Sequence, residues 1–383
     1  TVTGLGPSPL VTLALAGQDF TVNGSTIVNA YGVINDAVAA GTNIFNGPVI
    51  INENGRWTTS NNPPFIFRNG IIYDGFSFTS GTGNYTFEVN NQNIGGSQPL
   101  TIANVVVSGV TLTNINTGGL TVATFTGNGN LVNGDASHAV TLSLTGANPV
   151  QLTGTVDFIT WPNTVNYAST APVAQTIGAF DFYNLSSSST GGRTLINGGT
   201  IRIANIFSKG TNTYTVTGST VEFNGTSDQQ IPAFTFNNLT ISGGSTKILT
   251  GAVTVNNVLL LNGAVLELDN FNLTVASNVA NAIQGTFDAS NMIATNGAGY
   301  LIKNAASAQP LYPIGSGGYY SPVTISSVTP NTGVLRIRAV PQALNPSYLK
   351  KYWDITTSFA RTSVTATFQY DPAEENGAAQ TVN

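Results

Sequence analysis

The segment that decides the fold is residues 175–185, QTIGAFDFYNL, because it recurs as residues 229–239, QQIPAFTFNNL. Seven positions coincide: the first Gln, the Ile, the Ala, both Phe, the Asn and the final Leu. Downstream, residues 199–206 match residues 251–258 at a similar offset, and a weaker third copy lies at 87–109. We call the interval from Gln175 to Gln229 the long repeat. Such self-similarity is typical of an array in which each repeat packs only on its neighbours.

The strands that the sequence predicts are short and closely spaced. Apolar runs such as 253–255, 258–261 and 273–275 are separated by turn-forming pairs such as Asn262-Gly263. This pattern indicates an all-β protein, and the long repeat fits two or three rungs of about 20 residues each. A β-sandwich array has a similar strand spacing. We favour a right-handed parallel β-solenoid, or β-helix, because the runs are continuously apolar and Asn-rich turns can form ladders.

The composition excludes several classes of partner. Only 8% of residues are charged, the net charge is −5, and Lys350-Lys351 is the only adjacent basic pair. Binding to nucleic acid or to anionic lipid would need a dense basic patch. The chain has no Cys, so disulfides, thiol catalysis and structural zinc are excluded, and we expect no metal and no cofactor. The best helical pattern, residues 34–40, is short, and no apolar run is long enough for a membrane helix.

The pattern changes near residue 300. Basic residues and prolines become denser, and alternating strands follow, for example at 363–370. We therefore predict a β-solenoid over residues 1–300, with its clearest repeats at 165–218 and 219–275. An antiparallel β-sandwich-like domain over 301–383, incomplete in this chain, is predicted to follow it and to close that end. We expect the sequence to be a mature or trimmed piece of a longer protein.

Several motifs carry a resemblance to a known family. They are residues 223–226 (FNGT), 236–241 (FNNLTI), 253–275, 54–58 (NGRWT) and 67–70 (FRNG). This set resembles the repeats of very large cell-surface proteins from Bacteroidetes-type bacteria. The tail motifs YPIG and YWDI, starting at Tyr312 and Tyr352, look like the sandwich domain that often follows such repeats. The resemblance implies an extracellular protein of the bacterial cell surface, exported by type IX secretion, with some members acting as adhesins in attachment or gliding motility.

The single histidine does not predict a catalytic site. His138 follows Asp135 and Ser137 closely in the chain. Residues adjacent in sequence cannot adopt the geometry of a nucleophile, base and orienting acid. We interpret the segment as a polar turn.

The carboxylates are also interpreted as non-catalytic. A β-helix lyase or hydrolase needs carboxylates, or a carboxylate with a basic residue, clustered across neighbouring rungs. Glu222, Glu267 and Asp269 lie in the clearest repeats and could be brought together by stacking, but we expect solvated outward positions. Glu374-Glu375 is the pair most suited to calcium, although no calcium-binding loop motif surrounds it.

The aromatic residues suggest one weak binding candidate. Trp57 and Trp161 could stack on sugar rings. The Phe residues that repeat in register are expected to form a core stack instead; they are Phe180, Phe182, Phe234 and Phe236.

The function expected from the sequence is structural or adhesive rather than enzymatic. We expect a stalk or surface filament segment of a bacterial cell-surface adhesin, in which each rung supports its neighbours. Its partners would be a host or environmental surface, a polysaccharide or other copies and surface subunits, with the outer-membrane secretion machinery during export and no nucleic acid. A carbohydrate-active or carbohydrate-binding β-helix protein is the alternative.

Overall fold

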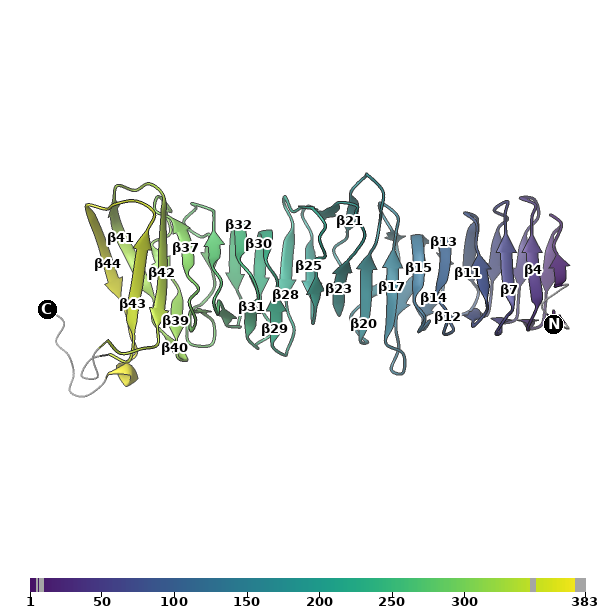
Figure 1. The fold of residues 1–383 in the computed structure, drawn as a ribbon, viewed down its shortest axis with the longest axis horizontal. Coiled ribbons are helices and arrows are strands. Elements are labelled where there is room, and N and C mark those ends of the chain that lie inside the picture. Colours follow the sequence, from purple (N-terminus) through teal and green to yellow (C-terminus); the bar gives the residue numbers. More distant parts are fainter. Residues whose placement is uncertain (5, 7–9, 345–348, 376–383) are drawn as a thin grey trace. The chain divides into compact units, whose positions relative to one another are not determined.

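The computed structural model describes residues 1–383 except 5, 7–9, 345–348 and 376–383 (Figure 1). The described chain is all-β and contains a parallel β-solenoid of about 15 turns. Its only described helix is a single 3-10 turn, η1 (Pro372–Glu374). The solenoid prediction is therefore confirmed, and parallel pairing excludes a β-sandwich array for the repeats, because a sandwich needs antiparallel strands.

The chain forms two compact units, and their segments alternate along the sequence between residues 195 and 216. Unit 1 comprises residues 1–195 and 208–215, and unit 2 comprises residues 196–207 and 216–383. Strand β26 (Phe207–Ser208) contains the boundary between the units.

In unit 1, strands of successive turns lie side by side in parallel sheets (Figure 1). The first sheet has the order β1 (Val11–Ala14), β4 (Gly32–Asp36), β7 (Arg56–Thr59), β10 (Ser77–Thr79). The second includes β2 (Phe20–Val22), β5 (Asn43–Phe45), β8 (Phe65–Phe67), β11 (Asn84–Glu88), β13 (Leu100–Ser108), β15 (Leu120–Gly127), β17 (Val140–Leu144), β20 (Asn163–Tyr167) and β23 (Asn184–Ser187), with β18 (Val150–Leu152) also beside β15. The third has β3 (Thr26–Val28), β6 (Val49–Ile51), β9 (Ile71–Tyr73), β12 (Gln92–Gly95), β14 (Thr111–Asn114), β16 (Asn130–Asn133) and β19 (Val156–Asp157). The shortest has β21 (Gln175–Ile177), β24 (Arg193–Leu195) and β27 (Tyr214–Thr215); β22 (Asp181–Phe182) meets residue 158 through a single bridge.

The register of these strands sets the length of one turn. Asn84 pairs with Asn104, and Leu100 pairs with Leu120, so the chain advances by 20 residues in each of these two turns. This interval confirms the predicted rung length at these turns. The long repeat therefore spans about three turns.

The core of unit 1 follows from the alternation of side chains along each strand. In β8 the outer residues are buried and the middle one is partly exposed, as expected when every second side chain points inward. Because the strands keep register, residues of the same type stack in successive turns. The ring centroids of Phe45 and Phe67 are 5.6 Å apart, and those of Phe67 and Phe87 are 5.2 Å apart. Buried aromatic columns of this kind contribute much of the apolar area that stabilises a solenoid.

The short helical pattern at residues 34–40 is not a helix. Ile34 belongs to strand β4, and it faces Trp57 of the next turn. The side chain of Ile34 is fully buried in the solenoid core. A run of small and apolar residues cannot be assigned by periodicity alone over so few residues, and tertiary packing decides the outcome here.

Unit 2 continues the same architecture. One sheet contains β25 (Thr200–Ile203), β28 (Thr220–Phe223), β30 (Phe234–Ile241), β32 (Val253–Leu261), β34 (Leu273–Val275), β37 (Leu301–Asn304), β42 (Val334–Val340) and β43 (Tyr352–Thr357), with β35 (Ile283–Gln284) also beside β32. A second has β29 (Gln229–Ile231), β31 (Lys247–Leu249), β33 (Leu266–Glu267), β36 (Ile293–Ala294), β39 (Ile314–Ser316) and β40 (Tyr319–Tyr320). A third has β38 (Leu311–Tyr312), β41 (Val323–Thr329) and β44 (Ser363–Phe368).

The pairing changes from parallel to antiparallel at β37. Leu301 of β37 faces Leu273 in a parallel pair on one side and Ile337 in an antiparallel pair on the other. Parallel stacking also continues past residue 300 through Ile314, which faces Ile293. The later strands are joined to the last solenoid turn within one sheet. Whether they form the predicted sandwich domain stays a prediction.

Candidate functional site

Trp57 is not available to a carbohydrate. Its ring is fully buried between the strands of unit 1, stacked on Phe78 with ring centroids 5.6 Å apart. The indole Nε1–H donates to the hydroxyl of Tyr85 over 3.0 Å, which satisfies the only polar atom of the ring. The prediction of sugar stacking on Trp57 is therefore wrong, because no face of the indole reaches the surface.

Trp161 remains partly exposed and lies beside the histidine turn. In that turn, Asp135 Oδ1 accepts from the backbone N–H groups of Ser137 and His138, each over 2.8 Å. His138 Nδ1 is 2.7 Å from the same oxygen. The backbone hydrogen bond from Ser137 is the main cause that holds the pKa of Asp135 below its usual range. The carboxylate therefore closes a polar turn, as expected from the sequence, and the role of Trp161 stays a prediction.

The carboxylates of the clearest repeats are not brought together. Glu222 lies on β28, where it pairs with Arg202 over 2.9 Å and accepts from Ser242 Oγ over 2.7 Å. Glu267 lies on β33 in another sheet, and its Oε1 accepts from the backbone N–H of Asp269 over 3.0 Å. Each carboxylate therefore binds its own neighbours, and stacking does not build a catalytic pair from them.

Glu374 and Glu375 do not point to a common cation. The Glu374 carboxylate is buried and forms an ion pair with Lys351, which also donates to Ser321 Oγ over 2.6 Å. Glu375 accepts from the hydroxyl of Tyr370 over 3.0 Å. Among the described residues, no group of three His, Cys, Asp or Glu side chains could hold a metal ion.

Buried glutamines hold the backbone where the chain turns from one strand to the next. Gln175 is fully buried, and its Nε2–H₂ donates to the carbonyls of Leu144 and Gly146, each over 2.8 Å. Gln229 does the same for Ile203 over 2.9 Å and for Asn205 over 3.1 Å. Buried carbonyls need a donor, and the side-chain amide supplies it. The Gln that begins each copy of the repeat therefore has a structural role.

A buried cation follows each of these glutamines in the next turn. Arg193 stacks on Gln175, and Lys247 stacks on Gln229 at the equivalent position of the next copy. Both cations are fully buried, and among the described residues neither pairs with a carboxylate. They donate to backbone carbonyls instead: Arg193 Nη1 to Gly191 over 2.7 Å, and Lys247 Nζ to Gly225 over 2.8 Å. Burial lowers the pKa of both groups.

These cations were missed from the sequence, because lone Lys and Arg residues are ordinarily solvated. A signal was nevertheless present. Residues 193–195 (RTL) match residues 247–249 (KIL) at the same offset that relates Gln175 to Gln229. In each copy, the cation lies one turn after the Gln and stacks on it.

Lys303 is a third buried cation, at the junction with the antiparallel strands. It is fully buried, donates to the carbonyls of Gln309 over 2.5 Å and of Leu311 over 3.0 Å, and lies 4.4 Å from the ring centroid of Tyr312. Burial without a counter-charge lowers the pKa of Lys303 to about 7.

We expect Lys303 to make unfolding pH-dependent. Between pH 7 and the ordinary Lys pKa, the unfolded chain binds a proton at Lys303 that the folded chain does not, so stability rises with pH in this window and is lost as pH falls toward 7. The free energy of unfolding of the wild type, minus that of Lys303→Met, should increase by about 2–3 kcal/mol from pH 7.5 to 9.5. Denaturant titration followed by circular dichroism measures it. A constant difference would show that folded Lys303 stays charged.

Polar side chains on the outside of unit 1 bind one another from turn to turn. Asn46 donates to Asn23 over 2.7 Å, Arg68 donates to Asn46 over 3.0 Å, and Arg68 pairs with Glu88 over 2.8 Å. We call this series the outer ladder. It contains one residue from each of four successive turns, and its hydrogen bonds run along the stack from one turn to the next.

A second series lies inside unit 1. Asn114 donates to Asn133 over 2.7 Å, and Asn133 donates to Asn163 over 2.9 Å. All three side chains are buried. We call this series the inner ladder; it confirms the expectation that Asn residues of successive rungs stack and bind each other.

No protein family model, curated protein or solved structure matches this chain. The resemblance to cell-surface repeats therefore stays a prediction. None of the helices in the described residues has the length and apolar character needed to cross a bilayer.

Proposed function

We propose that this protein is an extracellular structural and adhesive repeat protein, a stalk or surface filament segment of a bacterial cell-surface adhesin. The observation that carries the proposal is the outer ladder, in which Asn23, Asn46, Arg68 and Glu88 bind along the stack. A surface built this way uses its few charges to hold turns together. Stability of such an array is a sum over neighbouring turns, which suits a part whose task is to span a distance.

Two finer features of the architecture belong to the same proposal. We propose that the solenoid coils in a right-handed sense, because crossover connections between parallel strands of one sheet are almost always right-handed. We also propose that the antiparallel strands after β37 are a sandwich-like domain over residues 301–383. In support, β38, β41 and β44 form a sheet separate from the one that contains β42 and β43.

A carbohydrate-binding protein is the second candidate. It is favoured by Trp161, a partly exposed residue that lies next to the turn formed by Asp135 and His138. Aromatic rings at a polar surface can stack on the apolar face of a sugar. The separated positions of Glu222 and Glu267 give less support to a carbohydrate-active enzyme.

The proposal is tested on the cells that make the protein. An antibody raised against the purified chain should label intact, unpermeabilised cells, and an in-frame deletion of the whole chain should reduce their attachment to surfaces. Labelling that requires permeabilisation would contradict the extracellular location.

A shorter deletion separates a stalk from a specific binding surface. Removing the single turn 100–119 should leave attachment close to the wild-type level, because the neighbouring turns close the gap in register. If that deletion abolishes attachment while the protein folds and reaches the surface, the turn itself carries the binding activity and the stalk function is wrong.

A further inference from the structure

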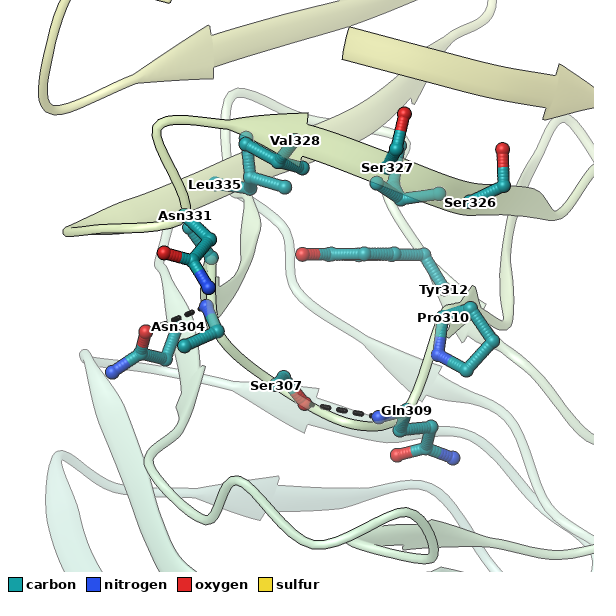
Figure 2. A pocket seen from close by; sticks show the side chains of 13 residues that line it. Asn304, Ser307, Gln309, Pro310, Tyr312, Ser326, Ser327, Val328, Asn331 and Leu335 are labelled. Atoms are coloured by element: carbon teal, nitrogen blue, oxygen red, sulfur yellow. Dashed lines mark hydrogen bonds between the residues drawn. The ribbon is translucent and has the colours of Figure 1, made fainter.

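A cavity in unit 2 lies between the loop 304–310 and strand β41 (Figure 2). Its volume is about 310 Å³, at the lower end of the range for small-molecule sites. None of the side chains that line it is charged. The lining combines apolar groups, among them Ile325 and Leu335, with amide and hydroxyl groups.

The hydroxyl of Tyr312 is the most informative group in this cavity. Tyr312 is 2% exposed as a whole residue, yet its Oη is not sealed off from the cavity, and no hydrogen bond joins this Oη to another described residue. Figure 2 shows the side chain extending beneath β41, with its hydroxyl directed toward the side where Asn304 and Asn331 lie. Burial alone raises the pKa of Tyr312, so the hydroxyl stays protonated and able to donate. A hydroxyl that opens onto a cavity and that the fold does not use is available to hydrogen-bond a ligand.

The walls of the cavity are held in place independently of any ligand. Gln309 anchors the loop by accepting from the backbone N–H of Ile283 over 2.8 Å and donating to its carbonyl over 2.6 Å. Asn304 Oδ1 accepts from the N–H of Ala306 over 2.9 Å within the loop. Lys303 lies 4.4 Å from the Tyr312 ring centroid and donates to the loop carbonyl of Gln309. The cavity is therefore preformed, which lowers the entropic cost of binding.

The hydroxyls of β41 are directed elsewhere. Ser327 Oγ donates to Thr365 Oγ1 over 3.0 Å, and Ser326 Oγ donates to the Thr365 carbonyl over 3.3 Å. Figure 2 shows both hydroxyls pointing away from Tyr312. The polar groups left to face the cavity therefore include Tyr312 Oη, Ser307 Oγ and the amide of Asn331, against apolar side chains such as Val328.

We propose that this cavity binds a neutral sugar residue, with Tyr312 Oη as the hydrogen-bonding anchor. A sugar presents hydroxyls that both donate and accept, and C–H faces that pack on aliphatic side chains, so it matches a mixed, uncharged lining. A charged ligand would lose hydration without gaining a counter-charge. The inference goes beyond the proposed function and does not depend on it, because it rests on the cavity alone.

The test uses the purified full chain and saturation-transfer NMR. The probes are methyl β-D-glucoside, methyl β-D-galactoside and N-acetylglucosamine, with glucuronic acid as the charged comparison. At least one neutral probe should bind with a dissociation constant on the order of 1 mM, as befits so small a ligand. Binding of none of the three, or equal binding of glucuronic acid, overturns the proposal.

Two variants locate the binding. Tyr312→Phe should weaken it about fivefold to tenfold, as loss of one hydrogen bond predicts. The same variant should melt close to the wild-type temperature, because the hydroxyl forms no hydrogen bond with the described residues. Val328→Trp should fill the cavity and abolish binding while circular dichroism stays unchanged.

Tyr320→Phe is the matched control, since Tyr320 lies outside the lining, and it should bind like the wild type. Unchanged affinity in Tyr312→Phe, or equal losses in Tyr312→Phe and Tyr320→Phe, overturns the assignment.

Discussion

Deleting residues 100–119 should leave a protein that folds, whereas deleting residues 100–109 should not. The longer deletion removes one complete turn. Leu120 then takes the place of Leu100, because β15 repeats the register of β13 position by position. In the next sheet, Leu131 and Asn133 of β16 take the places of Leu112 and Asn114.

The shorter deletion removes strand β13 but leaves β14 in place. Strand β11 then loses β13, its hydrogen-bonding neighbour in the next turn. The residues left between β12 and β14 are also too few to form a complete turn. Because each strand is hydrogen-bonded only to its neighbours in the stack, the break exposes the buried side chains of Tyr85 and Phe87.

Circular dichroism and thermal unfolding measure both proteins. The full-turn deletion should keep the β-spectrum and a cooperative transition, with a melting temperature within about 5 °C of the wild type. The half-turn deletion should lose the cooperative transition of unit 1. Equal behaviour of the two proteins would show that register between turns does not control folding.

Arg193→Met is expected to lower the free energy of unfolding by about 3–5 kcal/mol. The guanidinium supplies donors to the carbonyls of Tyr167 over 2.6 Å, Gly191 over 2.7 Å and Gly192 over 3.0 Å. A thioether cannot replace these hydrogen bonds. The site is fully buried, so water cannot reach the carbonyls unless the turn around Arg193 opens. Relief of the buried charge offsets part of the loss and is included in the range.

Two further variants make the Arg193 result specific. Arg193→Lys should lose about half as much, because Lys247 at the equivalent position of the repeat donates to only two carbonyls. Arg336→Met, at an exposed position, should change stability by no more than about 0.5 kcal/mol. Denaturant unfolding compares all three variants with the wild type. If Arg193→Met unfolds with the free energy of the wild type, the turn around residue 193 does not depend on the cation for its stability.

The parts of the fold that follow from spacing could be predicted from the sequence. The repeated Gln, Ile and Phe positions indicated stacked turns, and Phe182 and Phe236 are indeed fully buried. Their partners Phe180 and Phe234 are only partly buried, so the predicted core stack holds for one Phe of each copy. The repeat indicates which strands are equivalent. It does not indicate how much of Phe180 or Phe234 is covered by neighbouring residues.

The buried polar groups were missed, because residue type argues for the opposite environment and only the repeat match of Arg193 with Lys247 pointed to burial. Arg193, Lys247 and Lys303 are residue types that are ordinarily solvated, yet each is buried where a turn leaves carbonyls without donors. Trp57 illustrates the same difficulty in reverse. An aromatic residue beside Arg56 and Thr58 resembles a surface stacking site, and only its register with Ile34 of the preceding turn shows that it points inward.

The inner ladder also protects one Asn-Gly pair of this chain from spontaneous deamidation. An Asn followed by Gly rearranges readily, because the unhindered glycine nitrogen can attack the side-chain carbonyl. Asn133-Gly134 is such a pair, but the Gly134 N–H donates to the Asn114 carbonyl over 2.9 Å, and the Asn133 amide is held by Asn114 and Asn163. Spontaneous deamidation should therefore begin at pairs such as Asn23-Gly24, where both residues are exposed and the Asn23 side chain is held only by one hydrogen bond from Asn46 in the outer ladder. Chemical damage then starts on the outer surface before it reaches the interior of the stack.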